Sequence, residues 1–298
     1  MKELVVLSGK GGTGKTSLTA AFANLAKKSA ICDADVDAAD LHLLLNPQIK
    51  TTTTFQGGYE ARIDLNRCTS CGLCLDLCHF QAISQEFVVD GLNCEGCGVC
   101  VDMCPIQAIE FPLKNSGKWF SSETRFGPMV HASLGIAQEN SGKLVTLVRQ
   151  EARKVAQERD LEQIIIDGPP GVGCSVIASL TGASAVVIVA EPSLSGVHDM
   201  KRVLQLTSKL GVPAMVCVNK YDLNPELSAG ISQEIKKQHL VFLGNIPYDP
   251  DLTKAMIKSQ TIIEYAPDSP TSKAVIKIWE SIERFQGMQF SGITPVRN

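Results

Sequence analysis

The 298-residue sequence has no apolar run near the roughly 20 residues that a helix needs to cross a bilayer. It also has no excess of basic residues, since 28 Lys and Arg are outnumbered by 31 Asp and Glu. The formal net charge of −3 offers no broad positive field of the kind that attracts nucleic acid. The N-terminal segment MKELVVLSGKGG runs directly into a glycine-rich loop and shows no secretory signal. We therefore expect a cytoplasmic protein with no stable membrane insertion and no nucleic-acid partner.

Cysteine is abundant and is concentrated in one part of the chain. Eight of the eleven cysteines form two copies of a C-x2-C-x2-C-x3-C run, which begin at Cys68 and Cys94. The offset of 26 residues extends to a QAI segment that follows each copy. A disulfide framework is the alternative, but the spacing and the missing secretion signal favour metal ligation in a reducing compartment. The run is typical of bacterial ferredoxins, in which three cysteines hold one 4Fe–4S cluster and the fourth reaches the other.

This rule gives two sets of cluster ligands, Cys68, Cys71, Cys74 and Cys104 for the first and Cys94, Cys97, Cys100 and Cys78 for the second. Zinc is the rival metal, but cysteines grouped as three plus one and then repeated fit iron–sulfur clusters better. The first run ends in Cys78-His79, whereas the second keeps the usual proline in Cys104-Pro105. That proline shapes only the chain after the ligand, so we expect the cluster to be retained and His79 to be a surface residue.

The loop that follows the first apolar run is GKGGTGKT, residues 9–16, which matches G-x4-G-K-[ST] between a strand and a helix. Its glycines allow the backbone N–H groups to surround phosphates, and the helix N-terminus favours their negative charge. Lys15 is predicted to contact the β- and γ-phosphates, and Thr16 to bind Mg²⁺. The predicted nucleotide-binding residues of the loop are Gly9, Gly11, Gly12, Thr13, Gly14, Lys15, Thr16 and Ser17.

Acidic residues end two other apolar runs. Asp167 ends QIIID and is predicted to act on Mg²⁺ through water, and the segment 168–173 after it resembles a switch loop that senses the γ-phosphate. Asp33, Asp35 and Asp37 alternate at the end of the second run, so period-2 geometry points them toward the edge where ligands bind. We predict that Asp35 orients the attacking water and that Asp33 supports Mg²⁺. A solvated loop or a helix cap is the alternative for each aspartate.

Runs typical of strands alternate with amphipathic stretches typical of helices along most of the chain. The predicted strands are 3–8, 29–35, 163–167, 184–190, 214–219 and 240–246. The predicted helices are a stretch ending at Lys28, then 141–159, 172–181, 196–210, 225–238, 250–258 and 270–286. This alternation predicts an α/β fold with a mostly parallel sheet and helices on both of its faces.

The cysteine runs interrupt this alternation between about Gly57 and Pro112, and the alternation resumes afterwards. Such a change is typical of a module inserted into a surface loop. We predict a P-loop ATPase domain of residues 1–57 and 113–298. The inserted domain, residues 58–112, is predicted to be a small α+β domain like a bacterial ferredoxin.

With its early lysine, Lys10, the segment SGKGGTGKT resembles the deviant Walker A motif of the MinD/ParA/Mrp and nitrogenase-iron-protein class. DADVD and DGPPG resemble the switch segments of that class, and NKYD with NIPYD resembles its base-binding strand ends. EPSLSGVHDMKR, GPMVHASLGIAQENSGK and DGPPGVGCSVIAS look like segments of MinD-superfamily ATPases with an inserted ferredoxin domain. The resemblance covers essentially the whole chain.

The resemblance implies an ATPase in which Lys10 reaches across a dimer interface, so that two chains enclose two ATP molecules. The partner would be an identical chain or a paralogue. The catalytic residues are then Lys10, Lys15, Asp35 and Asp167, and the base-binding residues are Asn219, Lys220 and Pro247. NKYD is also the guanine-reading signature of GTPases, and the deviant loop favours ATP over GTP.

Other residues carry weaker signals. Glu191, Ser195 and His198 follow the 184–190 run and are candidates for linking the dimer or the insert to the ATP state, with a helix cap by Ser193 or Ser195 as the alternative. Cys174 follows the switch-like segment at the spacing of a cluster ligand in the nitrogenase iron protein, but 113–140 holds no second cysteine to complete such a cluster.

The surroundings of the three cysteines outside the two runs can also be predicted. We expect Cys174 to be a buried or interface thiol, with a dimer-interface ligand or a contact to the electron acceptor as the alternative. Cys32 and Cys217 lie in apolar runs and are expected in the core.

Together these features predict a Mg-ATP-dependent dimerising ATPase that contains two 4Fe–4S clusters and couples ATP to electron transfer to a redox or metalloprotein partner. Two other functions stay open: an iron–sulfur carrier or assembly scaffold, and a MinD-like positioning or regulatory protein with the clusters as redox sensor. The complete double run favours stable clusters over labile ones. A regulatory role would be supported by a basic membrane-targeting tail, but we expect AVIKIWESIERF to pack on the sheet.

Overall fold

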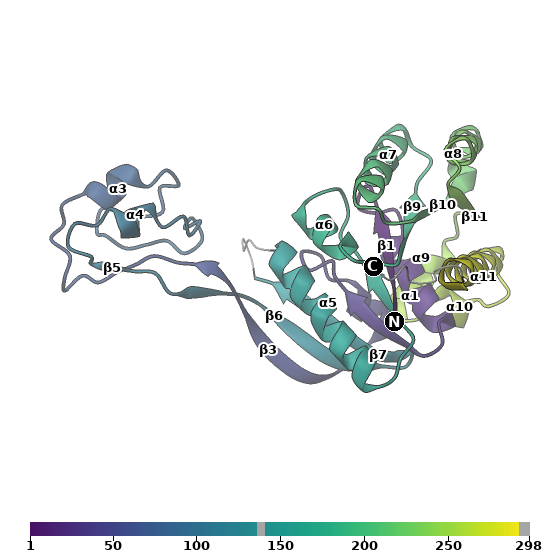
Figure 1. The fold of residues 1–298 in the computed structure, drawn as a ribbon, viewed down its shortest axis with the longest axis horizontal. Helices are drawn as coiled ribbons and strands as arrows, with labels where there is room; N and C mark the ends of the chain where they lie inside the picture. Colours follow the sequence, from purple (N-terminus) through teal and green to yellow (C-terminus); the bar gives the residue numbers. More distant parts are fainter. Residues whose placement is uncertain (136–140, 292–298) are drawn as a thin grey trace, which may run out of the picture. The chain divides into compact units, whose positions relative to one another are not determined.

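The computed structural model describes residues 1–135 and 141–291, with 286–291 described by their backbone alone. By packing, the chain divides into two units (Figure 1). The first unit contains Met1–Thr52, Phe120–Ala132 and the chain from Ser141 onward. The second contains Thr53–Trp119 and the described residues that follow Ala132. Each unit is therefore made of segments that are distant in sequence.

The first unit is built on a sheet with the strand order β11-β10-β9-β1-β8-β2-β7-β6-β3. Its central pairs, from β11 to β7, are all parallel. The strands are β1 Lys2–Ser8, β2 Ser29–Asp33, β3 Gln48–Tyr59, β6 Leu113–Thr124, β7 Gly127–Leu134, β8 Gln163–Asp167, β9 Ala185–Ala190, β10 Ala214–Asn219 and β11 Val241–Ile246. β1, β2, β8, β9 and β10 are buried along almost their whole length, as expected when helices cover both faces of a sheet. The predicted largely parallel α/β fold is confirmed.

Side-chain caps define several of the helices. Ser193 caps α7 by accepting a hydrogen bond from the Gly196 N–H at 3.1 Å, which confirms the cap that the sequence suggested. Thr261 and Glu264 form a capping box at the start of α10. The helical segments of the first unit are α1 Lys15–Leu25, α2 Leu41–Leu45, α5 Ser141–Glu158, α6 Cys174–Leu180, α7 Leu194–Lys209, the 3-10 turn Tyr221–Leu223, α8 Pro225–Lys237, α9 Asp251–Ile257, α10 Ile262–Tyr265 and α11 Pro270–Ser291.

The sequence patterns located the parallel strands and long helices to within a few residues but missed β3, β6 and β7. Residues 48–54 of β3 are all exposed, and their run of threonines lacks the apolar alternation that marks a half-buried strand. β6 is similarly polar. In the family-like segment that contains β7, residues 136–140 lie outside the described residues.

Both long strands, β3 and β6, continue from the first unit into the second. The packing division therefore falls inside these strands, after Thr52 and after Trp119. The predicted boundaries were 57/58 and 112/113. The differences arise because the chain enters and leaves the second unit as extended strand and not as loop.

The second unit contains a structural repeat that matches the repeat in its sequence. Its elements are α3 Leu73–Leu77, α4 Val99–Asp102 and an antiparallel pair of β4 Arg62–Ile63 and β5 Ile109–Glu110. The first cysteine of each run donates its backbone N–H to an aspartate carbonyl four residues earlier, at 2.9 Å in both copies. The glycines before α3 and α4 both have left-handed backbones, with φ of 83° and 78°.

The C-terminal helix α11 belongs to the main core of the first unit. Val275, Ile278 and Ile282 are buried together with Phe22 of α1, which confirms that this helix packs on the sheet side of the unit. Cys32 and Cys217 are fully buried, as predicted. Among the described residues, no helix has both the length and the apolar character to span a membrane.

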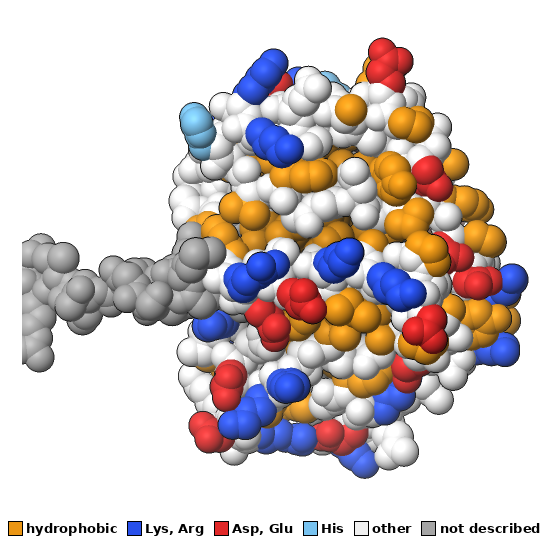
Figure 2. Space-filling view, turned by 90° about the vertical axis from the view of Figure 1, so that its right-hand side faces the viewer, with side chains coloured by type: hydrophobic (Ala, Val, Ile, Leu, Met, Phe, Trp, Pro, Cys, Tyr) orange, Lys and Arg blue, Asp and Glu red, His pale blue; other side chains and the backbone are white. Residues whose placement is uncertain are grey.

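The surface seen in Figure 2 carries acidic and basic side chains interspersed with apolar ones. The basic groups there do not gather into a field of one sign. This distribution agrees with the small formal net charge of −3.

Trp279 is expected to be a main contributor to the stability of the first unit. It is 4% exposed and packs on Phe22 with ring centroids 5.6 Å apart. Replacing Trp279 by Ala should lower the free energy of unfolding by about 3–5 kcal/mol, measured by urea denaturation followed by circular dichroism. Glu280→Ala, at the exposed neighbouring position, is the matched control. Equal urea midpoints for the two variants would contradict the assignment.

Candidate functional site

The carboxyl ends of the parallel strands bring the candidate residues to one edge of the sheet. The P-loop follows β1, Asp35 follows β2, Asp167 ends β8, and Asn219 ends β10. This edge is where ligands bind in open α/β sheets. A cavity of about 490 Å³ lies there and is lined by residues 11–17 of the loop, together with Ser8, Asp35, Ala38, Asp40, Pro170, Asn219, Lys220, Tyr248, Asp249, Leu252, Thr253 and Met256.

The P-loop is held in shape by a residue at the end of β10, which is separated from β1 by β9. The side-chain amide of Asn219 donates a hydrogen bond to the Thr13 carbonyl at 2.8 Å. Gly14 has φ of 86°, and a Cβ there would lie 2.4 Å from the Asn219 amide nitrogen, so only glycine fits. Lys15 begins α1 directly after this turn. The loop therefore presents the N-terminus of a helix to the cavity, an arrangement suited to phosphate.

Lys15 lies almost buried between two carboxylates. Its Nζ is 2.8 Å from Asp167 Oδ1 and 3.2 Å from Asp35 Oδ2. Burial acts to lower the pKa of Lys15, but Asp167 and Asp35 outweigh it and raise that pKa above its ordinary value. The Thr16 hydroxyl donates to Asp167 Oδ2 at 2.8 Å, so Thr16 and Asp167 lie together as a Mg²⁺ site would require.

The three alternating aspartates have different environments. Asp33 is fully buried, and its two carboxylate oxygens accept the backbone N–H groups of Asp35 and Leu41 at 3.1 and 3.2 Å. Burial and the nearby Asp167 raise the pKa of Asp33 well above its usual range. β2 ends at Asp33, so the strand alternation does not extend to Asp37, which is exposed. The prediction that all three point the same way is therefore wrong for Asp37.

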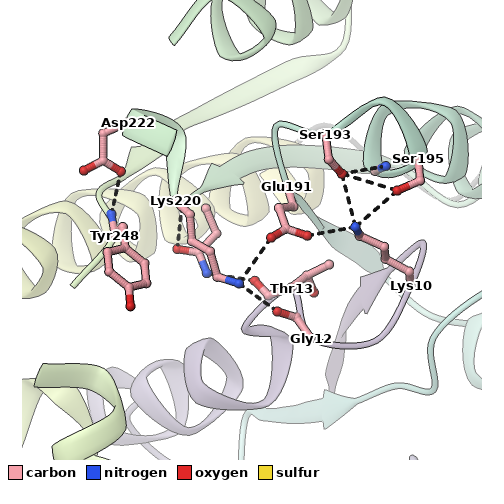
Figure 3. A network of polar contacts seen from close by, with 11 residues as sticks. Lys10, Gly12, Thr13, Glu191, Ser193, Ser195, Lys220, Asp222 and Tyr248 are labelled. Carbon is pink, nitrogen blue, oxygen red and sulfur yellow. Dashed lines mark hydrogen bonds and ion pairs between the residues drawn. The ribbon is translucent and has the colours of Figure 1, made fainter. Parts of the chain in front are cut away.

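Lys10 is bound within its own chain (Figure 3). Its Nζ lies 3.0 Å from Glu191 Oε2 and donates to the hydroxyls of Ser193 and Ser195 at 3.1 and 3.2 Å. Lys220 approaches the other Glu191 oxygen at 3.3 Å and also donates to the Gly12 carbonyl at 2.9 Å. Partial burial acts to raise the pKa of Glu191, but the two lysines hold it below its usual value.

The cavity wall beyond Lys220 was only partly foreseen. Asp222 Oδ1 accepts the backbone N–H of Tyr248 at 2.7 Å, which joins the ends of β10 and β11 (Figure 3). Tyr248 and Asp249 of the segment NIPYD line the cavity, whereas the predicted Pro247 and Gly9 are not among its lining residues. Leu252 and Met256 of α9 were missed, because only the folded sheet brings that helix to the loop.

The cysteines of the second unit line two separate pockets. One is lined by Cys68, Cys71, Cys74 and Cys104, and the other by Cys94, Cys97, Cys100 and Cys78. Each pocket thus combines three cysteines of one run with the last cysteine of the other run. These are the two sets that the spacing predicted as ligands. Among the described residues, no three His, Cys, Asp or Glu side chains are grouped to hold a single metal ion.

The chemistry of the pockets suits a polynuclear cluster. Backbone N–H groups point at sulfur in equivalent places, from Ala82 to Cys78 Sγ and from Ala108 to Cys104 Sγ, both at 3.3 Å. Burial and the neighbouring thiols raise the pKa of Cys100 to about 11, because thiolates brought together repel one another. Bound iron would relieve that repulsion by supplying positive charge.

Cys174 and His198 line neither the P-loop cavity nor the two cysteine pockets. Cys174 begins α6 and is exposed, so it is not buried within the chain, and its expected place at an interface stays a prediction. The His198 ring is also exposed and contacts only the Asp199 carboxylate among the described polar groups, at 3.2 Å.

Comparison with known proteins agrees with the geometry of the P-loop site. The profile of the CobQ/CobB/MinD/ParA nucleotide binding domain matches residues 4–262. An uncharacterized protein of Methanocaldococcus jannaschii is 31% identical over 287 residues, which is 95% of this chain and 97% of that protein. The cytosolic Fe-S cluster assembly factor NUBP2 of Bos taurus is 28% identical over 151 residues, 46% of this chain and 55% of that protein.

A solved structure shows the same fold. The septum site-determining protein MinD of Pyrococcus horikoshii, complexed with Mg-ADP, superimposes with a TM-score of 0.60 at 18% identity. The match covers 97% of this chain and 98% of that one. The chain therefore belongs to the CobQ/CobB/MinD/ParA nucleotide-binding family and is a P-loop ATPase.

Proposed function

We propose that this ATPase dimerises with Mg-ATP and couples nucleotide binding and hydrolysis to electron transfer through two 4Fe–4S clusters to a partner protein. The observation that carries the proposal is the pairing of two four-cysteine pockets with a complete P-loop site in one chain. A deviant P-loop alone would fit a positioning ATPase equally well. The cysteine pockets favour a redox function.

On the ATP side, the residues already in contact would exchange partners when nucleotide binds. The backbone N–H groups of the loop and the α1 N-terminus would hold the phosphates, and Lys15 would turn from Asp167 to the β- and γ-phosphates. Thr16 and, through water, Asp167 would hold Mg²⁺. Asp35, 3.2 Å from Lys15, is the residue we propose to orient the attacking water.

On the cysteine side, each pocket would hold one 4Fe–4S cluster by its four thiolates. A bound cluster of this kind supplies one-electron chemistry. The described N–H groups directed at Cys78 and Cys104 would stabilise the negative charge on sulfur. Cys71 and Cys97 are exposed, which leaves a side of each pocket open to a redox partner.

A continuous set of contacts leads from the switch acid to the strands shared with the second unit. Asp33 accepts N–H groups from Asp35 and from Leu41, the first residue of α2. Arg125, in the β6–β7 connection, donates to the carbonyls of Leu44 and Leu45 at the other end of α2, at 3.1 and 2.9 Å. The helix α2, which leads into β3, is thus hydrogen-bonded at its start to Asp33 and at its end to Arg125 of the β6–β7 connection. A shift of Asp35 with nucleotide would move both connections.

Dimerisation would require Lys10 to leave its present partners. The resemblance to the deviant Walker A class assigns Lys10 to the partner's nucleotide, whereas here it is bound by Glu191, Ser193 and Ser195 of its own chain. We propose that ATP-dependent pairing with an identical or paralogous chain exchanges these contacts for phosphate.

A second function has specific support. The relative NUBP2 is named as a cytosolic Fe-S cluster assembly factor, so transfer of clusters is the alternative to transfer of electrons. The match covers less than half of this chain. The two functions differ in whether the clusters stay bound.

Iron content tests the pockets directly. Anaerobically purified protein should contain about eight iron and eight sulfide per chain, as two 4Fe–4S clusters require. Cys104→Ser should lower that content by about half, since Cys104 lines one pocket, while Cys174→Ser, outside both pockets, should leave it unchanged. Equal iron in Cys104→Ser and wild type would refute the ligand set. Loss of iron from wild type to excess apo-ferredoxin would favour the carrier function.

The Lys10 and Lys15 variants separate binding from pairing. Lys15→Ala should weaken ATP binding at least tenfold, because it removes the phosphate contact. Lys10→Ala should bind ATP but fail to dimerise, measured by fluorescent-nucleotide titration and by light scattering with ATP. Lys27→Ala, at an exposed position two residues after the end of α1, is the control. ATP-dependent dimers of Lys10→Ala would contradict the proposed role of Lys10.

A further inference from the structure

The two cysteine pockets correspond to each other almost residue by residue. With the 26-residue offset of the repeat, the wall of the first pocket maps onto that of the second. The equivalent lining pairs besides the cysteines are Ile63 and Val89, Thr69 and Glu95, Phe87 and Ala61, Ile106 and Phe80, Ala108 and Ala82, and Ile109 and Ile83. The two pockets can therefore be compared position by position, and each difference can be assigned to one pair of residues.

One of these pairs differs in charge. Thr69, one residue after the first cysteine of its run, is neutral, whereas its equivalent Glu95 carries a carboxylate at the wall of the second pocket. A second difference lies one residue before the first cysteine, where Arg67 corresponds to Asn93. Both differences act in the same direction. Arg67 makes the surroundings of the first pocket more positive, and Glu95 makes those of the second pocket more negative.

The remaining charges near the repeats do not offset this difference. Asp64 and Asp76 of the first copy have equivalents in Asp90 and Asp102 of the second. Arg62 and Lys114 each lie 3.8 Å from Glu60, and Arg62 is also opposite Glu110 in the β4–β5 pair, so these four side chains balance one another. Glu86 is fully exposed and hydrogen-bonded to Ser84, and it lines neither pocket.

We infer that the two clusters are unequal, and that the cluster held by the Cys68 set accepts an electron before the one held by the Cys94 set. This inference rests on the proposed function, because it requires both clusters. The step adds one electron from an external one-electron reductant to a 4Fe–4S core, and no bond breaks. A neighbouring positive charge stabilises the added electron and a neighbouring negative charge opposes it. Glu95, at the wall of the second pocket, thus orders the two sites, and Arg67, beside Cys68 but outside the lining of the first pocket, acts in the same direction. The second cluster is the stronger reductant.

The expected effect of each charge on the reduction potential is moderate, because Arg67 and Glu95 are exposed and water screens their charges. We expect each charge to change the equilibrium constant for reduction of its cluster about three- to tenfold. For a one-electron couple, a tenfold change corresponds to about 59 mV.

The test is an EPR-monitored redox titration of the full chain with dithionite and mediators under anaerobic conditions. The wild type should show two potentials. Glu95→Gln should raise the lower one and Arg67→Gln should lower the upper one, so that each variant narrows the separation. Glu95→Asp and Arg67→Lys, which keep the charges, should leave the separation unchanged. Glu226→Gln, which removes an equal exposed charge from α8 of the first unit, should also leave it unchanged.

Two results would overturn the inference. One is a single wild-type potential for both clusters, and the other is a Glu95→Gln variant in which the upper potential rises and the separation widens. Iron and sulfide analysis of each sample separates this failure from failure of the proposed function. Full iron with an unshifted lower potential in Glu95→Gln rejects the inference alone, whereas protein without iron rejects both.

Discussion

The buried ion pair between Lys15 and Asp167 is the interaction on which the nucleotide site depends. It joins the start of α1 to the end of β8 at 2.8 Å, with side chains that are 7% and 1% exposed. A charge so deeply buried is costly unless it is paired, so loss of either partner would leave the other uncompensated. Asp35 and the Thr16 hydroxyl belong to the same network. Phosphate that attracts Lys15 must therefore disturb Asp35, and this dependence makes the site responsive to nucleotide.

The second unit is inserted in the chain at a point where contacts from the nucleotide site reach both of its connections. The chain leaves the first unit through α2 and β3, directly after the switch acids, and returns through β6 and β7 beside β2. Asp33 holds the first residue of α2, and Arg125 holds its end. The duplicated cysteine runs thus lie in the chain between these two connections, which the proposed coupling would use.

Much of this arrangement could be predicted from the sequence because the determinants are local. The P-loop and the buried strands follow from short spacings in which neighbouring residues decide the chemistry. The two four-cysteine sets follow from the ferredoxin rule that assigns the last cysteine of each run to the other run. β3 and β6 could not be predicted, because polar strands with exposed side chains are stabilised by pairing and not by pattern. Leu252 and Met256 were missed for a related reason, since only the folded sheet brings α9 to the loop. The double pairing of Glu191 with Lys10 and Lys220 likewise joins three different strand ends.

The proposed function requires that the nucleotide site and the clusters be coupled within one chain. The most direct measurement is the reduction potential of the clusters in wild-type protein, with and without a saturating non-hydrolysable ATP analogue. Coupling requires the analogue to shift at least one potential, because a ligand that favours one conformation changes every equilibrium linked to it. Identical potentials with the analogue bound and absent, in protein that contains its full iron, would contradict the account.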